Sequence, residues 1–479
     1  MIRGLVPRSS IPNNGPMKRF LRDSFFVAAL SIAACTGSSS GPIGSGSDLA
    51  VPSDLTVADD QAMPADLAVG GPDRSMPPDA RMPPDLATAS DGPPPDLTVP
   101  NDLPMPPDMA VPPDIAVPPD LVTPPDLTRV LSFAAPLYFD VGQSPHGIVM
   151  GDWNGDGKPD AAVTVSNVNG SYLAVLINAG GAQFRPAVKY ATQIGPQGVA
   201  ALDVNGDGKL DLVSANAGVN VTTGSAFAGV GDGTFKPLPD IAAAAGGRWI
   251  ATGDINGDNI SDLVFACAAQ NVNVLPKLKG VGNGTFTSIG SEVAGNSPIW
   301  DALADMNGDG KLDLVVLAQA GSVFYLVGKG DGTFPSATSY AVPPTLPMGG
   351  ALGDWNADGK PDVAVANGNT PTVSVFDNIG AGALGARRDF NMPAGIAYAV
   401  TAGDFDRDGK LDLAAGNTDS VVVFTGKGNG DFNPSLVIPA AKYNYWITTA
   451  DVDGDGRLDI ITTNGNTGSM AVLRNTSAP

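Results

Sequence analysis

The amino-acid sequence predicts an all-β fold, a seven-bladed β-propeller, from three observations. An Asp-rich loop of nine residues recurs seven times, at spacings of 47 to 51 residues. A Gly-Asp-Gly or Gly-Asn-Gly turn recurs with the same period, and short apolar runs lie between loops and turns. These runs have the length of strands, and no helical period of useful length is present. A repeat of this length, built from short strands and turns, is typical of a propeller in which each repeat forms one blade.

The loops share the pattern Asp-x-Asn/Asp-x-Asp-x-x-x-Asp and begin at Asp152, Asp203, Asp254, Asp305, Asp354, Asp404 and Asp451. In each loop, oxygen-bearing side chains stand at positions 1, 3, 5 and 9. Alternate side chains of a tightly curled loop converge on one point, where the backbone carbonyl of position 7 can join them. Such an all-oxygen set suits Ca²⁺. Turn formation alone needs only one or two Asx residues, not four at fixed offsets.

The pattern therefore predicts up to seven structural calcium sites. An EF-hand is excluded, because position 12 of the first loop is Val163, within an apolar run, where an EF-hand needs Glu. The third loop fits least well, since Asn259 replaces Gly at position 6. The predicted ligands are Asp152, Asn154, Asp156, Lys158, Asp160, Asp203, Asn205, Asp207, Lys209, Asp211, Asp254, Asn256, Asp258, Ile260, Asp262, Asp305, Asn307, Asp309, Lys311, Asp313, Asp354, Asn356, Asp358, Lys360, Asp362, Asp404, Asp406, Asp408, Lys410, Asp412, Asp451, Asp453, Asp455, Arg457 and Asp459.

The second landmark is the turn Gly231-Asp232-Gly233-Thr234-Phe235, matched at 282–286, 330–334 and 428–432. Its glycines supply the positive φ that hairpin turns need. Loop and turn together resemble the FG-GAP/VCBS repeat of integrin α-subunit propellers and bacterial surface proteins, over about residues 131–479. The resemblance implies a propeller over residues 129–479. It does not imply one activity, because members include adhesion receptors, lectins and some polysaccharide-degrading enzymes.

The N-terminal 35 residues have the pattern of an export signal. A positively charged start at 17–22 precedes the apolar stretch 25–34, which is too short to span a membrane. The tetrapeptide that ends at Cys35 resembles the bacterial lipobox, which implies lipidation of Cys35. We therefore expect residues 1–35 to be a signal peptide that starts at Met17. The protein would be exported and lipid-anchored to the bacterial envelope, at the outer membrane or cell surface. Ordinary signal-peptidase cleavage is the alternative.

Residues 36–128 are rich in Pro and Asp and contain a strict six-residue period. Asp96, Asp102, Asp108, Asp114, Asp120 and Asp126 follow that period. Six residues are two turns of a polyproline II helix, so the carboxylates would share one face. This composition cannot pack a core and predicts a disordered, semi-rigid stalk. A Pro-rich ligand for a partner domain is the alternative.

The two ends of the propeller region carry incomplete repeats. Phe133 lies 51 residues before Phe184, which lies 51 before Phe235, and no Gly-Asp-Gly turn precedes Phe133. We expect a strand near Leu131–Tyr138 to complete the blade formed by 442–474. This pairing would join the first and last blades and remove two exposed sheet edges.

The composition excludes several functions. With 49 acidic residues, 27 basic ones and a net charge of −22, the chain lacks the basic face that nucleic acid requires. His146 is the single histidine, in a turn-like Ser-Pro-His-Gly, and no nucleophile elbow is present, so we predict no enzyme. Cys267 follows an apolar run and is expected to be a buried small hydrophobe.

Three tryptophans share one repeat position, five residues before a loop: Trp249, Trp300 and Trp446. The other blades have Gly or Ala there. Flat aromatic faces beside small residues suit sugars or peptide side chains, which makes these residues candidate ligand contacts. The alternative is that they fill gaps between blades.

These inferences predict a calcium-binding cell-surface module for binding or adhesion. Its partner would be a glycan or an extracellular protein, and it would meet the membrane only through a lipid anchor. A secreted polysaccharide-active enzyme, either a calcium-dependent lyase or a hydrolase, is one alternative. A structural surface component is another.

Overall fold

The computed structural model describes residues 130–167, 170–218, 221–268, 274–342, 346–393 and 395–478. The predicted signal peptide with Cys35 and the predicted stalk lie outside these residues. Within them, every regular element is a β-strand, as the sequence predicts. The described residues contain no helix of the length and apolarity that a membrane crossing requires.

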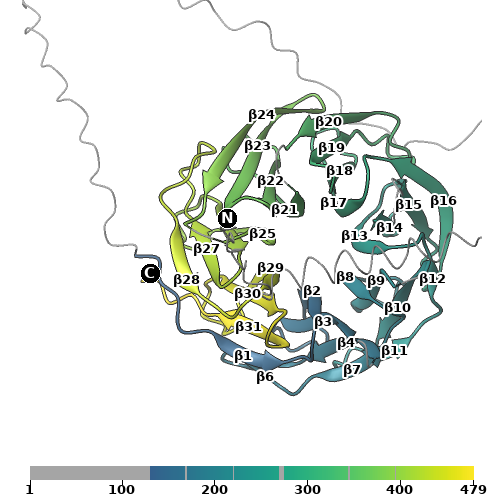
Figure 1. The fold of residues 1–479 in the computed structure, drawn as a ribbon. Coiled ribbons are helices and arrows are strands. Elements are labelled where there is room, and N and C mark those ends of the chain that lie inside the picture. Colours follow the sequence, from purple (N-terminus) through teal and green to yellow (C-terminus); the bar gives the residue numbers. More distant parts are fainter. Residues whose placement is uncertain are drawn as a thin grey trace, which may run out of the picture. The chain divides into compact units, whose positions relative to one another are not determined.

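The strands form seven antiparallel blades arranged around a common centre (Figure 1). Blade 1 consists of β2 (Pro145–Gly151), β3 (Asp160–Asn167), β4 (Gly170–Leu176) and β7 (Val188–Ala191), with the hairpin of β5 (Asn178–Gly180) and β6 (Gln183–Phe184) between β4 and β7 in the chain. Blade 2 consists of β8 (Pro196–Leu202), β9 (Asp211–Asn216), β10 (Thr223–Gly229), β11 (Phe235–Pro237) and β12 (Ile241–Ala242). Blade 3 consists of β13 (Gly247–Gly253), β14 (Asp262–Cys267), β15 (Val274–Gly280) and β16 (Phe286–Val293).

The remaining blades repeat this plan. Blade 4 consists of β17 (Pro298–Ala304), β18 (Asp313–Ala318), β19 (Ser322–Leu326) and β20 (Ala337–Ala341). Blade 5 consists of β21 (Pro347–Gly353), β22 (Asp362–Asn367), β23 (Thr372–Gly380) and β24 (Ala383–Asn391). Blade 6 consists of β25 (Ala399–Gly403), β26 (Asp412–Gly416), β27 (Ser420–Phe424) and β28 (Leu436–Pro439). Blade 7 consists of β29 (Asn444–Ala450), β30 (Asp459–Asn464), β31 (Ser469–Leu473) and β1 (Leu137–Asp140).

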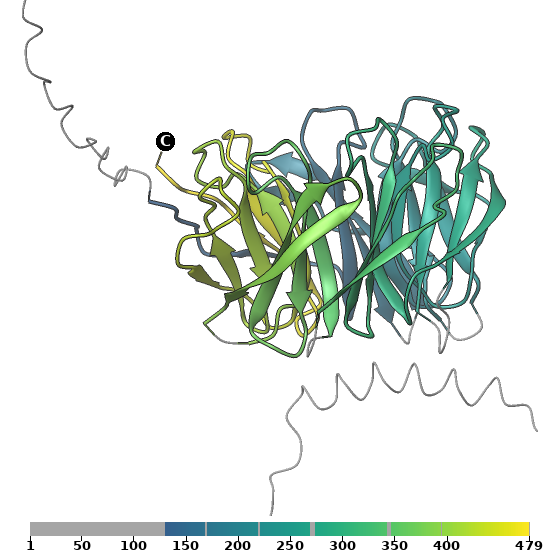
Figure 2. The ribbon, with the colours of Figure 1, turned by 90° about the horizontal axis from the view of Figure 1, so that it is seen from above.

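The first strand of each blade faces the centre of the ring, and the first strands of neighbouring blades pack against one another. Each first strand runs into an Asp-rich loop, which leads to the second strand. We call the end of the ring with these loops the loop end. The opposite end, where the chain enters each first strand, is the entry end. Figure 2 shows the strands running between the two ends.

The second strand of each blade is covered on both faces by the neighbouring blades. In β14, all six residues from Asp262 to Cys267 are buried. Both faces of such a strand must be apolar, which is why these runs show no alternation. Cys267 is fully buried, as expected, and burial raises the pKa of its thiol to about 12.

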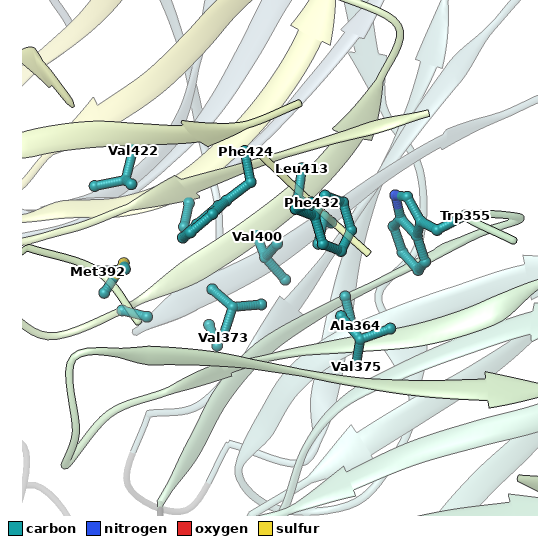
Figure 3. Packing of buried hydrophobic residues seen from close by; sticks show 13 residues of the cluster. Trp355, Ala364, Val373, Val375, Met392, Val400, Leu413, Val422, Phe424 and Phe432 are labelled. Atoms are coloured by element: carbon teal, nitrogen blue, oxygen red, sulfur yellow. The ribbon is translucent and has the colours of Figure 1, made fainter. Parts of the chain in front are cut away.

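The hydrophobic core is divided into clusters, several of which lie between neighbouring blades. Figure 3 shows one of them, between blades 5 and 6. Val373 and Val375 of β23 meet Val422 and Phe424 of β27 there. Each blade is therefore stabilised by its neighbours rather than by a core of its own.

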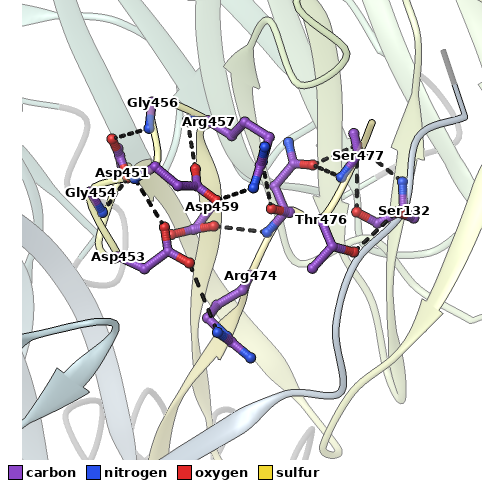
Figure 4. Close-up of polar contacts among 12 residues, drawn as sticks. Ser132, Asp451, Asp453, Gly454, Gly456, Arg457, Asp459, Arg474, Thr476 and Ser477 are labelled. Atoms are coloured by element: carbon purple, nitrogen blue, oxygen red, sulfur yellow. Dashed lines mark hydrogen bonds and ion pairs between the residues drawn. The ribbon is translucent and has the colours of Figure 1, made fainter. Parts of the chain in front are cut away.

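The ring is closed by the two ends of the described chain. β1 pairs antiparallel with β31, from Leu137 opposite Val472 to Asp140 opposite Ser469. Closer to the loop end, the Thr476 N–H donates to the Ser132 carbonyl at 2.8 Å, and the Ser132 N–H donates to Ser477 Oγ at 3.1 Å (Figure 4). Blade 7 thus takes its outer strand from the N-terminal side, as the repeat spacing predicts.

We predict that this outer strand is required for ring stability. A chain shortened to begin at Thr128 keeps β1 and should melt close to the full-length protein in circular dichroism. A chain shortened to begin at Ser144 loses β1 and exposes the edge of β31, so its melting temperature should fall clearly. Equal melting of the two shortened chains would contradict the closure.

Candidate metal loops and the ring centre

The last Asp of each Asp-rich loop, position 9, connects the loop to the rest of its blade. In the first loop, Asp160 is fully buried. Its Oδ2 accepts from the Trp153 N–H at loop position 2, at 3.1 Å, and its Oδ1 accepts from the Asn178 N–H, just after the third strand, at 2.7 Å. The same pair of hydrogen bonds occurs at Asp211, Asp262, Asp313, Asp362, Asp412 and Asp459.

Burial of these carboxyl groups raises the pKa of all seven, and neighbouring loop carboxylates raise it further. The pKa reaches about 6 at Asp362 and Asp459 and about 7 at Asp412. A carboxylate held in this way among other carboxylates is stabilised by a nearby cation.

Positions 1 and 3 organise the loop backbone. Asp152 accepts from the Gly155 N–H through Oδ1 and from the Gly157 N–H through Oδ2, both at 2.8 Å. Asn154 Oδ1 accepts from the Asp156 N–H at 2.8 Å. In the third loop Asn259 adopts a φ of 62°, and its N–H still donates to Asp254 Oδ2 at 2.7 Å. Asn is one of the few residues that tolerate this left-handed conformation, so the third loop keeps the shape of the others.

The structure brings some of the predicted ligands together. Among the described residues, two groups of carboxylates each offer one oxygen per residue within 4.8 Å of one another: Asp404, Asp406 and Asp412 at positions 1, 3 and 9 of the sixth loop, and Asp451, Asp453 and Asp459 of the seventh (Figure 4). The other five loops have Asn at position 3. These donors are all hard oxygen ligands, a set that fits Ca²⁺.

The carboxylate at position 5 forms an ion pair in several loops. Asp156 Oδ2 lies 2.9 Å from Lys158 Nζ, and Asp358 Oδ2 lies 2.8 Å from Lys360 Nζ. The side chain at position 7 interacts with the position 5 carboxylate in this way in the first, second, fifth, sixth and seventh loops. Sequence reasoning considered only the backbone carbonyl of position 7.

Position 2 of the loop is a structural residue that sequence reasoning missed. Its N–H donates to the buried Asp of its own loop, and its carbonyl accepts a hydrogen bond from the next blade. The carbonyls and donors are Trp153 with Gly233 N–H, Val204 with Gly284 N–H, Ile255 with Gly332 N–H, Met306 with Asn378 Nδ2, Trp355 with Gly430 N–H, Phe405 with Asn475 Nδ2, and Val452 with Asn178 Nδ2. Every loop is thus joined to the adjacent blade around the whole ring.

The donors follow a simple rule. Where a blade has the Gly-Asp-Gly or Gly-Asn-Gly turn, the second Gly donates; in blades 1, 5 and 7 an Asn side chain donates instead. At Gly233 the φ of 85° and the approach to blade 1 both demand glycine, because a Cβ would lie 2.7 Å from Ile177 Cδ1. The sequence could have indicated these three Asn residues, because each stands 16 or 18 residues after the buried Asp of its own blade.

The side chain at position 2 is large and apolar in every loop, and all seven are buried. Trp355 shows its role: the indole packs against Phe432 and Leu413 of blade 6 (Figure 3). Its Nε1 donates to the Asp412 carbonyl at 3.3 Å. The side chain at loop position 2 therefore fills the space between its own blade and the next one.

The three tryptophans predicted as ligand contacts all lie on first strands. Trp249 of β13 and Trp446 of β29 stack on each other, with ring centroids 4.3 Å apart and an interplanar angle of 20°. They belong to blades 3 and 7, so the stack crosses the centre of the ring. Trp300 of β17 is 6% exposed and packs in the same cluster. This burial favours the gap-filling interpretation for Trp300, because a platform must be open to its ligand.

His146, expected as a plain turn residue, lies in β2 at the entry end. Its imidazole stacks on Tyr445 of β29, with centroids 6.1 Å apart and an interplanar angle of 14°. Burial and then the charge of Arg248 lower the pKa of His146 to about 4, so the ring is neutral at physiological pH.

The fold and the loops define a seven-bladed propeller whose blades are joined through repeated Asp-rich loops. A family model described as FG-GAP-like repeat matches residues 152–214, 203–265, 305–365, 354–415 and 404–462. These ranges together span more than half of the chain, so the chain belongs to the FG-GAP-like repeat family. The fold suggests a binding module. A comparison with curated protein sequences finds no match.

Solved structures resemble this chain at low sequence identity. The crystal structure of BBS1N in complex with ARL6DN, soaked with lead, has a TM-score of 0.51 and 12% identity and covers 72% of this chain and 96% of that chain. The same complex soaked with mercury has a TM-score of 0.47 and 12% identity, over 71% and 98%. An Agrocybe aegerita lectin that recognises non-reducing terminal N-acetylglucosamine has a TM-score of 0.43 and 18% identity, over 63% and 81%. At such sequence identities the similarity shows the fold alone. Only the lead-soaked BBS1N complex, with a TM-score above 0.5, supports that statement.

We predict that the buried loop Asp is the most sensitive position of each loop. Replacing Asp160→Ala leaves the Trp153 and Asn178 N–H groups without an acceptor, which should cost about 2 to 5 kcal/mol of unfolding free energy. Denaturant unfolding with a chelator present measures this without a metal contribution. The control Asp156→Ala removes an exposed carboxylate of the same loop and should cost much less. Equal losses would show that Asp160 has no special structural role.

We predict that Trp300 is a core residue. Replacing Trp300→Ala should lower the unfolding free energy by about 3 to 5 kcal/mol, because it opens a cavity in the cluster at the ring centre. The Trp300→Phe variant keeps part of the packing and should lose less. An unchanged melting temperature for Trp300→Ala would refute the gap-filling interpretation.

Proposed function

We propose that this protein is a calcium-stabilised binding module displayed on a bacterial cell surface, with a glycan as its partner. The observation that carries the proposal is the repeated loop. In all seven copies a fully buried Asp holds the loop and the third strand together, among further oxygen ligands. An exported protein without a disulfide framework needs another cross-link for its loops, and calcium supplies one.

Positions 1, 3 and 9 of each loop would hold the ion, supported by the carbonyl of position 7. When bound, calcium offsets the mutual repulsion of the loop carboxylates. The chain itself holds the loop in shape. Backbone N–H groups orient the carboxylates, and the carbonyl of position 2 accepts a hydrogen bond from the next blade. Calcium binding would therefore stiffen both the loop and the contact between blades.

The display would follow from the N-terminal region. A signal peptide that ends in lipidated Cys35 and a Pro-rich stalk over 36–128 would hold the propeller away from the envelope. A rigid ring on a long spacer suits recognition of a ligand outside the cell. The FG-GAP-like fold, which suggests a binding module, supports this proposal.

We predict that removal of calcium destabilises the propeller. Because an ion that binds only the folded form stabilises it by mass action, a chelator should lower the melting temperature clearly at neutral pH. The affinity of each loop should be weak, on the order of 10⁻⁴ to 10⁻³ M, as in extracellular modules. Differential scanning calorimetry across a calcium titration measures both quantities.

The matched control for this titration is magnesium, which dehydrates reluctantly and demands octahedral geometry, so it should restore little of the lost stability. Identical melting with calcium and with chelator would mean that the loops are not metal sites.

A further inference from the structure

At the entry end, one repeat position carries three polar side chains on three consecutive blades. This position lies six residues before each Asp-rich loop. Its occupants in blades 1 to 7 are His146, Gln197, Arg248, Ile299, Met348, Tyr398 and Tyr445. Because neighbouring first strands pack against one another around the centre, these residues lie at equivalent places on adjacent strands, and we call them the entry ring.

The three polar members, His146, Gln197 and Arg248, lack internal partners. Each is half-buried. Among the described residues, none of their side chains makes a hydrogen bond or an ion pair, and Arg248 Nε is buried without a partner. Buried polar groups in proteins are hydrogen-bonded in the great majority of cases. Arg248 is such an exception, and beside it His146 and Gln197 present polar atoms that a ligand from outside the chain can reach.

The backbone that carries these side chains is held in place. Thr463 Oγ1 of blade 7 donates to the His146 carbonyl at 2.7 Å, and Thr164 Oγ1 of blade 1 donates to the Gln197 carbonyl at 2.6 Å. On one side of the imidazole, Tyr445 stacks against it and is itself stacked on Tyr443 at 5.9 Å. The backbone at His146 and Gln197 and one face of the imidazole are therefore fixed by neighbouring blades.

The charge of the entry ring matches a single negative charge. Arg248 is positive, and His146, whose charged form is disfavoured by burial and by Arg248, is neutral. Asp301 is the one acidic residue on the first strands. It is 1% exposed, and burial raises the pKa of its carboxyl group well above the usual value. Among the described residues it forms no ion pair with Arg248. The single positive charge of Arg248 balances the single negative charge of a carboxylate, whereas a phosphate dianion would keep one negative charge unbalanced.

The groups beside Arg248 suit sugar hydroxyls. A carboxamide and a neutral imidazole each both donate and accept hydrogen bonds, as a hydroxyl group requires. The Trp249–Trp446 stack lies one residue further along the same strands, and both of its rings are half-buried rather than fully covered. An aromatic surface next to polar groups is a common combination in sites for amphipathic ligands.

We propose that the entry ring binds a uronic acid residue of an acidic glycan. Arg248 binds the sugar carboxylate, and Gln197 and His146 bind ring hydroxyls. The inference rests on the proposed function and specifies its ligand class. Both can be tested with the full-length protein in calcium.

The test is isothermal titration of a galacturonate tetrasaccharide into the wild-type protein and the Arg248→Met variant. Loss of a charge-assisted hydrogen bond should weaken binding at least about tenfold. The control is Lys236→Met, which removes the same charge from an exposed residue of β11 and should leave affinity unchanged. The same tetrasaccharide with its carboxyl groups reduced to alcohols should bind wild type as weakly as the intact sugar binds Arg248→Met.

Equal binding of the intact and the reduced sugar, or full affinity of Arg248→Met, would overturn the inference. So would equal affinity for a tetra-aspartate peptide, which would assign the site to acidic proteins. The comparison of intact with reduced sugar uses wild type alone, so it holds even if Arg248→Met fails to fold. Specific binding of neutral glycans on an array, without binding of the tetrasaccharide, would overturn the inference and leave the proposed function standing. No binding of any glycan would overturn both.

Discussion

The ring depends on one hydrogen-bonded connection that is repeated seven times. At each Asp-rich loop, the buried Asp of position 9 accepts from the loop and from the third strand of the same blade. The residue at position 2 then offers its carbonyl to the next blade. Because each blade shares its hydrophobic core with its neighbours, none has a core of its own, and the position of one blade relative to the next must be set by such contacts. The loops therefore connect each blade to the next around the whole ring.

This design concentrates negative charge where the blades meet. The buried carboxyl groups have raised pKa values because they are desolvated and surrounded by other loop carboxylates. In five of the loops, Lys or Arg at position 7 offsets part of this charge at position 5, and none of these pairs involves the buried Asp of position 9. A divalent cation at each loop would offset the remainder. The calcium dependence that we propose is thus a consequence of the same Asp residues that join the blades.

The two ends of the ring differ in chemical character. The loop end repeats nearly the same residues in all seven blades, because the same joint must be made seven times. The entry ring varies from blade to blade, with polar side chains on blades 1 to 3 and apolar ones on blades 4 and 5. The entry-ring position takes no part in the hydrogen bonds that connect the loops to neighbouring blades. Its variation therefore leaves it available for recognition, beside the Trp249–Trp446 stack.

The sequence by itself determined the repeat, the blade number, the Asp-rich loops and the outer strand of blade 7, because these depend on local spacing: Asp at fixed offsets, Gly at turns, and Phe133 in register with Phe184. The sequence did not identify position 2 of the loops or the donors Asn178, Asn378 and Asn475, whose partners lie on other blades. It also gave no indication that Trp249 stacks on Trp446, four blades along the chain. Only ring closure brings residues so distant in sequence to one centre. His146, Gln197 and Arg248 share one repeat position on consecutive blades, and only the tertiary structure showed how far each of them is buried.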